Sequence, residues 1–245
     1  MRNIDKTRPT ELAKANHKRI ATTNKQQTPI RCTQINLQHL RSATDHPMNL
    51  IRQDPTDIVF VQEPYQIQNK TAGTTRSYRT CITNEDKSRV AIIIANDNID
   101  ALLIKQLSDR DTTEIEVRYK STRFIAASMN LDIKGEMNNK ITKIEEILKF
   151  GLGTGILINM DSNSRSQVWY DKQMIIRGRT LKEYLTSRDL NIMNQESDHA
   201  TCHSRRGRSN IDLTITNDHI LKRFKQWEIS MEDSCSDHNI IKFNI

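Results

Sequence analysis

The sequence predicts an α/β fold in which most of the strands are buried. Eight short runs rich in Ile and Val, each bounded by polar residues or glycine, have the length and composition of strands. Segments with apolar residues at helical spacing lie between some of these runs. Because strands that alternate with helices are typical of sheets covered by helices, we expect an α/β domain.

Eight strands and three helices are predicted in chain order. One helix covers residues 136–150, where apolar residues recur at helical spacing, and Gly151 ends it. Pro47 suits the first turn of another helix that runs to about residue 53, and the capping-box pattern Thr180-Leu-Lys-Glu183 opens a third through about residue 188. The strands are predicted over residues 30–37, 57–62, 90–95, 114–119, 123–130, 155–160, 211–216 and 239–245.

The positive charge is concentrated at the N-terminus. The 245 residues include 37 Lys and Arg and 30 Asp and Glu, a net charge of +7. Residues 1–29 hold seven basic and two acidic side chains, so they account for +5 and residues 30–245 for the remaining +2. We expect a basic, mobile arm over residues 1–29, one domain over residues 30–245, and a nucleic acid as the polyanionic partner.

Several other classes of protein are excluded. The longest apolar runs, residues 90–95 and 155–160, are much shorter than the ~18 residues of a membrane span, so no membrane partner is expected. The polar N-terminus lacks the apolar core of a secretory signal. The four cysteines lie far apart without a CxxC pair, so neither a zinc site nor a disulfide framework is expected, and a reducing compartment fits.

Polar residues stand at the ends of several predicted strands, where open α/β sheets place their sites. Asn36 lies at the end of the first strand, and Glu63 directly follows the second. Asp161 and Asn163 follow the sixth strand two residues apart, so an extended segment turns both side chains the same way. Turn or loop residues of purely structural role are the alternative interpretation of all four.

Residues 201–213 predict a hairpin with a basic tip. Gly207 supplies a tight turn between two strands, and Arg205, Arg206 and Arg208 surround it. Arginines clustered at a hairpin tip suit insertion into a nucleic-acid groove, whereas a plain solvated hairpin is the alternative.

Asp212 and His238 could form a carboxylate–imidazole pair. Asp212 lies near the end of the hairpin, and His238 stands in Ser236-Asp-His-Asn239, before the last predicted strand. Such a pair would raise the pKa of the imidazole and keep it protonated beside a phosphate. A structural histidine in a generic loop is the alternative.

The order of these signals is more specific than any one of them. Asn36, Gln62-Glu63-Pro64, Asp161-Ser-Asn-Ser-Arg165, Asn210-Ile-Asp212 and Ser236-Asp-His238 follow one another across residues 30–245. With these motifs the chain resembles the endonuclease/exonuclease/phosphatase superfamily, which includes apurinic/apyrimidinic endonucleases and DNase I. It looks most like the endonuclease domains of non-LTR retrotransposons, closest to the site-specific insect elements that target ribosomal DNA or telomeric repeats. The resemblance implies a four-layered α/β sandwich, with two packed mixed sheets flanked by helices.

The resemblance also implies a role for each matching residue. Glu63 would bind the divalent metal, Mg²⁺ or Mn²⁺, with Asn36 beside it and Asp237 assisting, because a hard cation prefers such oxygen ligands. Asp161 would orient and deprotonate the attacking water. Asn163 would hydrogen-bond the scissile phosphate. Asp212 would orient His238, whose imidazolium would stabilise the pentacoordinate phosphate.

Contacts with double-stranded DNA are implied for two stretches. The hairpin is a groove-contacting specificity element in retrotransposon relatives, and a second basic stretch, residues 165–188, could follow the phosphate backbone. The residues expected to contact DNA are Thr201, Ser204, Arg205, Arg206, Arg208, Asn130, Arg165, Arg177 and Arg179.

The chain departs from the family pattern at three positions. Asn130 stands where a tyrosine is usual, so it could still donate to a phosphate oxygen but has no phenolic proton. Met160 replaces a glycine that commonly precedes the catalytic aspartate. Gln38 stands where repair enzymes have an acidic residue, which argues against a metal ligand there and mildly against a repair role.

The implied reaction is a metal-dependent nick in one DNA strand at a specific target. The nick would leave a 3′-hydroxyl that primes reverse transcription by a downstream reverse-transcriptase domain of the same polyprotein. We expect synthesis in the cytoplasm, action in the nucleus, and a monomer as an isolated domain. An abasic-site repair endonuclease and a non-catalytic DNA-targeting module are the alternatives.

Overall fold

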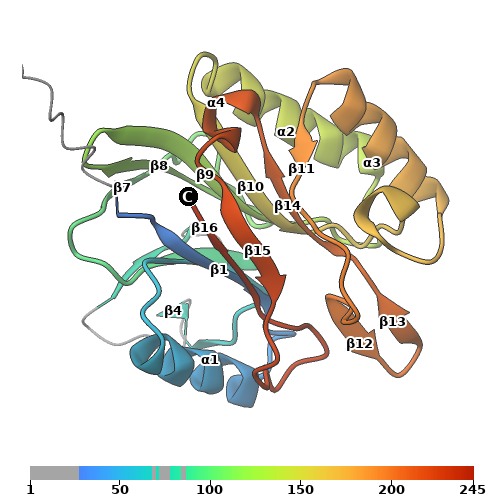
Figure 1. Cartoon of the computed structure of the whole chain (residues 1–245), viewed down its shortest axis with the longest axis horizontal. Coiled ribbons are helices and arrows are strands. Elements are labelled where there is room, and N and C mark those ends of the chain that lie inside the picture. The colour runs from blue at the N-terminus through green and yellow to red at the C-terminus, as the bar shows by residue number, and fades with distance from the viewer. Residues whose placement is uncertain (1–27, 68–69, 72–77, 84–86) are drawn as a thin grey trace, which may run out of the picture.

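Two six-stranded sheets face one another in the computed structural model, which describes residues 28–67, 70–71, 78–83 and 87–245 (Figure 1). The predicted arm over residues 1–29 lies outside the described residues, except for its last two. The first sheet has the order β15 (Lys225–Ile229), β16 (Ile241–Asn244), β1 (Arg31–Asn36), β2 (Ile58–Gln62), β6 (Val90–Ile94), β5 (Arg79–Cys81). The second has the order β11 (Asn191–Ile192), β14 (Asp212–Thr216), β10 (Gly155–Asp161), β9 (Thr122–Asn130), β8 (Thr112–Tyr119), β7 (Asp100–Leu103).

Both sheets are mixed. Strand β1 runs parallel to β2, and β9 runs parallel to β10, whereas the other pairs in the two sheets are antiparallel. Two short hairpins complete the strands: β3 (Gln66–Ile67) with β4 (Lys70–Thr71), and β12 (Cys202–Ser204) with β13 (Gly207–Ser209). The helices are α1 (Arg41–Gln53), α2 (Met137–Phe150), α3 (Ile176–Ser187) and α4 (Asp218–Leu221).

The apolar side chains form three packed clusters, which define four layers. One cluster fills the space between the sheets, with Phe60 from one sheet and Phe124 from the other. A second joins the outer face of the second sheet to α2 and α3, and a third lies on the outer face of the first sheet, where α1 contributes Ala43 (Figure 1). The predicted four-layered α/β sandwich is therefore confirmed.

Strand β9 shows why the central strands have continuous apolar sequences. Phe124 and Ala126 face the other sheet, whereas Ile125 and Ala127 face the helices. Because side chains alternate along a strand, a strand covered on both faces needs apolar residues at successive positions. This pattern made all eight predicted strands recognisable, and each predicted run overlaps an observed strand.

The strands absent from the prediction include β5, β7, β11 and β15, which stand at the four edges of the two sheets. An edge strand is covered less completely and tolerates polar residues, so its sequence lacks a strong strand pattern. In β15, for example, Lys225, Gln226 and Glu228 are exposed, and only Trp227 and Ile229 are buried.

Two of the three predicted helix starts are wrong. The helix α1 begins at Arg41, so Pro47 lies in its interior. The helix α3 begins at Ile176, so Thr180 is not a cap; its hydroxyl donates to the Ile176 carbonyl at 3.2 Å, one turn back within the helix. The helix over residues 136–150 is correct, with Gly151 as its C-cap. Among the described residues, no helix is long and apolar enough to cross a bilayer.

Candidate active site

The ends of five central strands bring polar side chains together at one edge of the sandwich. In the second sheet Asp161 of β10 pairs in register with Asn130 of β9 on one side and with Asp212 of β14 on the other. In the first sheet Asn36 ends β1 and Glu63 directly follows β2, which is parallel to it. Both sheets therefore contribute carboxylates and amides to the same edge.

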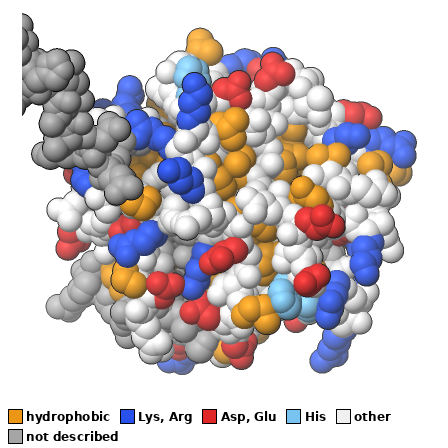
Figure 2. All heavy atoms as spheres, viewed as in Figure 1, with side chains coloured by type: hydrophobic (Ala, Val, Ile, Leu, Met, Phe, Trp, Pro, Cys, Tyr) orange, Lys and Arg blue, Asp and Glu red, His pale blue; other side chains and the backbone are white. Residues whose placement is uncertain are grey.

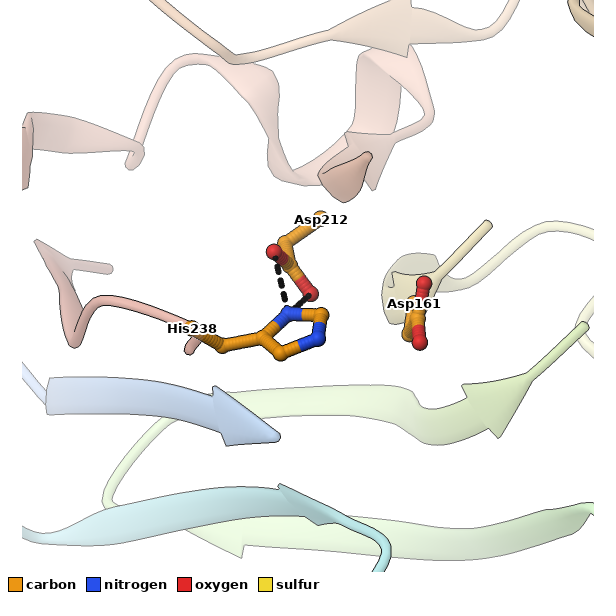
Figure 3. Close-up of side chains that lie close together, drawn as sticks. All are labelled: Asp161, Asp212 and His238. Carbon is orange, nitrogen blue, oxygen red and sulfur yellow. Dashed lines mark hydrogen bonds and ion pairs between the residues drawn. The ribbon is translucent and has the colours of Figure 1, made fainter. Parts of the chain in front are cut away.

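Asp212 and His238 form the predicted carboxylate–imidazole pair (Figure 3). The imidazole Nδ1 lies 2.9 Å and 3.1 Å from the two carboxylate oxygens, and both residues are buried. Burial by itself would lower the pKa of His238, but the charge and hydrogen bond of Asp212 outweigh it and raise that pKa well above its usual value. The ring is thus an imidazolium whose other nitrogen remains available to a ligand.

Asp161 is held by three hydrogen bonds beside this pair. Asn36 Nδ2 donates to its carboxylate at 2.9 Å, and the backbone and side-chain nitrogens of Asn163 donate at 3.0 Å and 3.2 Å. Burial raises the pKa of Asp161 to about 7, opposed by His238 and assisted by the charge of Asp212. A carboxyl with a pKa near neutrality is suited to accept a proton from water.

The site offers the oxygen donors that a divalent metal ion requires. Asp161, Asp212 and His238 each have a ligand atom within 4.8 Å of the others. However, His238 Nδ1 is already committed to Asp212, and an imidazolium is not a metal ligand. The remaining donors are oxygens, which fit a hard cation such as Mg²⁺.

Glu63 and Asn130 add oxygen atoms on the other side of Asp161. Asn130 Nδ2 donates to Glu63 Oε1 at 3.1 Å, and Asn130 Oδ1 is buried without a hydrogen-bond partner among the described residues. Glu63 adopts a left-handed backbone conformation with φ 47°, which is costly for a glutamate and recurs at functional sites. A bound cation would satisfy both the Glu63 carboxylate and the orphaned amide oxygen, so the residues present fit the metal.

Asp237 and Gln38 lie next to the site, where the backbone of Asp237 contacts the side chain of Gln38. The Asp237 N–H donates to Gln38 Oε1 at 2.9 Å, so the glutamine braces the segment that carries His238. Asp237 is only half-buried, and its carboxylate makes no hydrogen bond in the part of the chain that the structure describes. Its predicted assistance to the metal remains a prediction.

The predicted basic hairpin is present and projects from the body below the second sheet (Figure 1). Arg205 and Arg206 form the two-residue turn, and Gly207 follows it with φ 111°, a conformation that favours glycine. The Ser204 hydroxyl accepts the Arg206 N–H at 3.1 Å and so fixes the turn. Both turn arginines and Arg208 are exposed, and Lys and Arg side chains project at the corresponding end of the molecule in Figure 2.

Three residues predicted to contact DNA also make contacts within the protein. Arg165 forms a 2.9 Å ion pair with the buried Asp171, and Arg177 donates to four backbone carbonyls of the loop after β9. Thr201 is fully buried, and its hydroxyl accepts two backbone N–H groups. Direct phosphate contacts by these side chains stay predictions, as does that of Arg179, which is exposed.

Sequence reasoning missed Ser236 as a support of the site. Its hydroxyl donates to the Asn36 carbonyl at 2.8 Å and accepts the His238 N–H at 3.2 Å. The serine thereby ties the first sheet to the segment of His238. Its place in Ser236-Asp-His238 was the only signal in the sequence, and a contact 200 residues apart cannot be read from spacing.

Comparison with known sequences finds retrotransposon proteins. The family described as "Endonuclease-reverse transcriptase" matches residues 123–242. Over 191 residues the chain is 23% identical to the "Retrovirus-related Pol polyprotein from type-1 retrotransposable element R1" of Bradysia coprophila. The match covers 73% of this chain but only 19% of the polyprotein, so the chain spans about a fifth of that relative.

Solved structures give the same result for the fold. The endonuclease domain of TRAS1, described as a telomere-specific non-LTR retrotransposon, matches with a TM-score of 0.79 and 25% identity. That match covers 89% of this chain and 98% of the other. The AP endonuclease LMAP from Leishmania major matches with a TM-score of 0.69 and 10% identity over 89% of this chain and 87% of that one, which is a likeness of fold alone.

Proposed function

Because the chain belongs to the endonuclease/exonuclease/phosphatase superfamily, as the endonuclease domain of a non-LTR retrotransposon, we propose that it nicks one strand of duplex DNA in a metal-dependent reaction. The nick would leave a 3′-hydroxyl that primes reverse transcription. The observation that carries the proposal is the pairing of a near-neutral carboxyl, Asp161, with the imidazolium of His238 at one buried edge.

The residues of the chain divide the reaction between them. Asp161, oriented by Asn36 and Asn163, would accept a proton from the attacking water. The His238 imidazolium, oriented by Asp212, would stabilise the negative charge that grows on the phosphate during attack. One group must act as base and the other as cation, and the opposite environments of the two side chains suit these roles.

The metal would be held by Glu63 with the amide oxygens of Asn36 and Asn130 beside it. When bound, a divalent cation supplies neutralisation of the phosphate charge and stabilisation of the leaving 3′ oxygen. A role for Asn130 in this set replaces the phosphate contact expected from its position in the family pattern. Mg²⁺ or Mn²⁺ is the proposed ion, because both take oxygen ligands of this type.

A plasmid assay tests the reaction. Supercoiled plasmid should become nicked circles with Mg²⁺ and remain intact when EDTA is added. His238→Ala should lower the nicking rate about 10²- to 10⁴-fold. His219→Ala, which changes an exposed histidine, should leave the rate unchanged. Equal nicking with EDTA, or by the His238 variant, would contradict the proposal.

The target is proposed to be a defined chromosomal repeat. TRAS1 is described as telomere-specific, and R1 is a type-1 retrotransposable element, so repeats of the kind that such elements enter are the first duplexes to test. Nicks should be mapped on telomeric repeats, ribosomal DNA, random sequence and a duplex with one abasic analogue. Strong preference for the abasic duplex would favour a repair function instead.

The wider context follows from the polyprotein relatives. We propose that the domain acts beside a reverse-transcriptase domain of the same polyprotein, in the nucleus after synthesis in the cytoplasm, and that the isolated domain is a monomer. Support comes from the likeness to a Pol polyprotein. Light scattering of the isolated domain tests whether it is a monomer. Imaging of the tagged full-length protein tests whether it acts in the nucleus.

A further inference from the structure

The two members of the Asp212–His238 pair are attached to different strands of the basic hairpin. Asp212 begins β14, directly after the end of β13 and a two-residue link. Cys202 of β12 forms a β-bridge with His238, and the His203 N–H donates to the Asp237 carbonyl at 2.6 Å. A tilt of the hairpin would therefore move the Asp212 carboxylate through β13 and the His238 imidazole through β12. These are the two paths from the hairpin to the pair.

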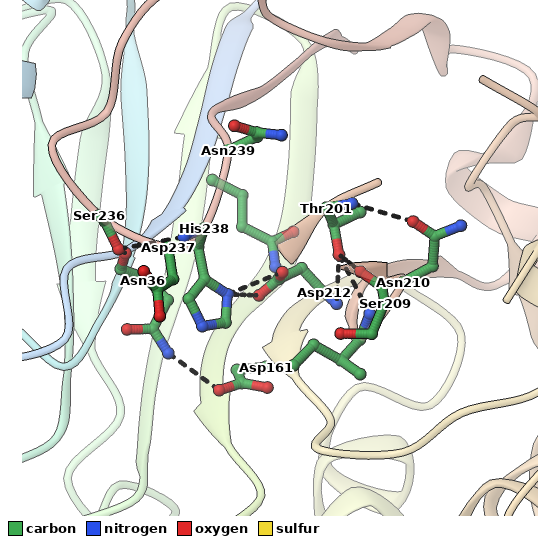
Figure 4. A network of polar contacts seen from close by, with 12 residues as sticks. Asn36, Asp161, Thr201, Ser209, Asn210, Asp212, Ser236, Asp237, His238 and Asn239 are labelled. Carbon is green, nitrogen blue, oxygen red and sulfur yellow. Dashed lines mark hydrogen bonds and ion pairs between the residues drawn. The ribbon is translucent and has the colours of Figure 1, made fainter. Parts of the chain in front are cut away.

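Thr201 stands where these two paths meet (Figure 4). Its hydroxyl accepts the N–H groups of Ile211 at 3.0 Å and Asp212 at 3.1 Å, and its carbonyl accepts the Asn239 N–H at 2.8 Å. The residue is fully buried, so water cannot replace these bonds. One side chain thus fixes the backbone of Asp212 to the same residue that holds the segment of His238.

The junction is braced from a third direction. Asn210 Oδ1 accepts the Thr201 N–H at 2.9 Å, and the Asn210 N–H donates to Asp171 at 2.7 Å. Asp171 is buried and paired with Arg165, whose guanidinium also donates to the Arg208 carbonyl in the hairpin. The base of the hairpin is therefore rigid, and displacement at its tip is transmitted rather than absorbed.

We propose that Thr201 is a positioning residue that couples the basic hairpin to the Asp212–His238 pair, so that engagement of DNA by the hairpin raises turnover as well as affinity. This inference rests on the proposed function. The physical reason is that catalysis tolerates little misplacement of the groups involved, and a shift of about 1 Å can cost about 10²-fold in rate. A buried N–H that loses its acceptor is driven to find another, which would displace Asp212.

Three single variants separate positioning from stability. Thr201→Val keeps the shape and removes the acceptor, so kcat for nicking a defined target should fall about 10- to 100-fold while KM changes little. Thr201→Ser restores the hydroxyl and should recover most of kcat. Thr154→Val is the matched control, because that hydroxyl donates to the Gly151 carbonyl at the far end of β10; it should lower Tm without lowering kcat.

A double-variant cycle tests the coupling itself. Alanine at Arg205, Arg206 and Arg208 should lower kcat in the wild-type background and have a smaller effect on kcat in the Thr201→Val background, because the path is already broken. Equal fold-losses in both backgrounds would overturn the coupling, as would a Thr201→Val variant with lowered Tm and unchanged kcat. If the wild-type domain does not nick DNA at all, the proposed function fails instead, so the two failures are distinguishable.

Discussion

The catalytic edge and the hairpin tip are built in opposite ways. Asp161 and Asp212 are 3% and 2% exposed and lie at the ends of central strands of the second sheet. Arg205, Arg206 and Arg208 are exposed on a two-stranded hairpin that belongs to neither sheet. The proposed chemistry therefore depends on buried groups, among which burial raises the pKa of Asp161, whereas the proposed recognition depends on solvated charges that can reach a groove.

The difference explains how a nearly neutral domain can act on DNA. Residues 30–245 carry a net charge of only +2, so attraction by the whole domain is weak. Positive charge is instead placed locally, on the hairpin and at the buried imidazolium. Such an arrangement suits an enzyme that visits DNA and dissociates, and the salt slope of binding measures it.

The largest effect is expected from the catalytic edge. Asp161→Asn keeps the size of the side chain but removes the base, so nicking should fall by about 10³-fold while DNA binding is retained. Asp97→Asn, at an exposed aspartate, is the control and should nick normally. Rates come from single-turnover assays and binding from fluorescence anisotropy. Normal nicking by the Asp161 variant would break the assignment of chemistry to this edge.

A smaller and different effect is expected from the hairpin tip. Alanine at Arg205, Arg206 and Arg208 should weaken cleavage of a defined target by about 10- to 100-fold, since each lost base contact costs about 1–3 kcal/mol at most, and should relax the cleavage positions. The unfolding midpoint should not change, because these side chains are exposed. Sequencing of the nicked ends measures the relaxation.

The control for the tip removes the same charge elsewhere. Lys105, Lys222 and Lys225 are exposed at other places on the domain, and their replacement by alanine also removes three positive charges. Cleavage positions should then stay as in the wild type. Relaxed cleavage in both triple variants would show that the tip acts only through net charge.

The smallest effect concerns a buried carboxyl that lies outside both regions. Glu114 is fully buried on β8, both its oxygens lack partners among the described residues, and burial raises its pKa to about 9. Between its ordinary value and about 9 the unfolded chain loses a proton that the folded chain keeps, so stability falls as pH rises, by about 1 kcal/mol per pH unit. Glu114→Gln should remove this slope without changing nicking.

Urea unfolding at pH 6 and pH 8 measures that slope. The exposed Glu183→Gln variant should keep the wild-type difference between the two pH values. An unchanged slope in the Glu114 variant would show that this carboxyl ionises normally. Unchanged nicking by the Glu114→Gln variant would show that this buried carboxyl takes no part in the reaction.

Much of the fold was predictable because buried strands have a recognisable local sequence pattern. Strands covered on both faces, such as Val90–Ile94, have apolar residues at every position. The edge strands and the start of α3 were not predictable, because partial exposure weakens the pattern and Thr180-Leu-Lys-Glu183 imitates a cap in the interior of a helix. Tertiary packing overrode the local preference there, since Gly178 lies against the backbone of Arg165 and fixes an earlier start.

The sequence by itself determined which residues are available for chemistry. The order Asn36, Glu63, Asp161, Asp212 and His238 carried the resemblance to the family. It also located the basic hairpin, because a glycine among arginines between two strands is a local signal.

Only the tertiary structure decided what each of these residues does. Asn36 meets Asp161 across 125 residues, and burial in the folded protein raises the pKa of Asp161 to about 7. Arg165, a predicted DNA contact, also donates to the Arg208 carbonyl 43 residues away, a contact that its spacing in the sequence does not reveal. Charge and hydrogen bonding act through space, so a residue's role depends on neighbours that only folding supplies.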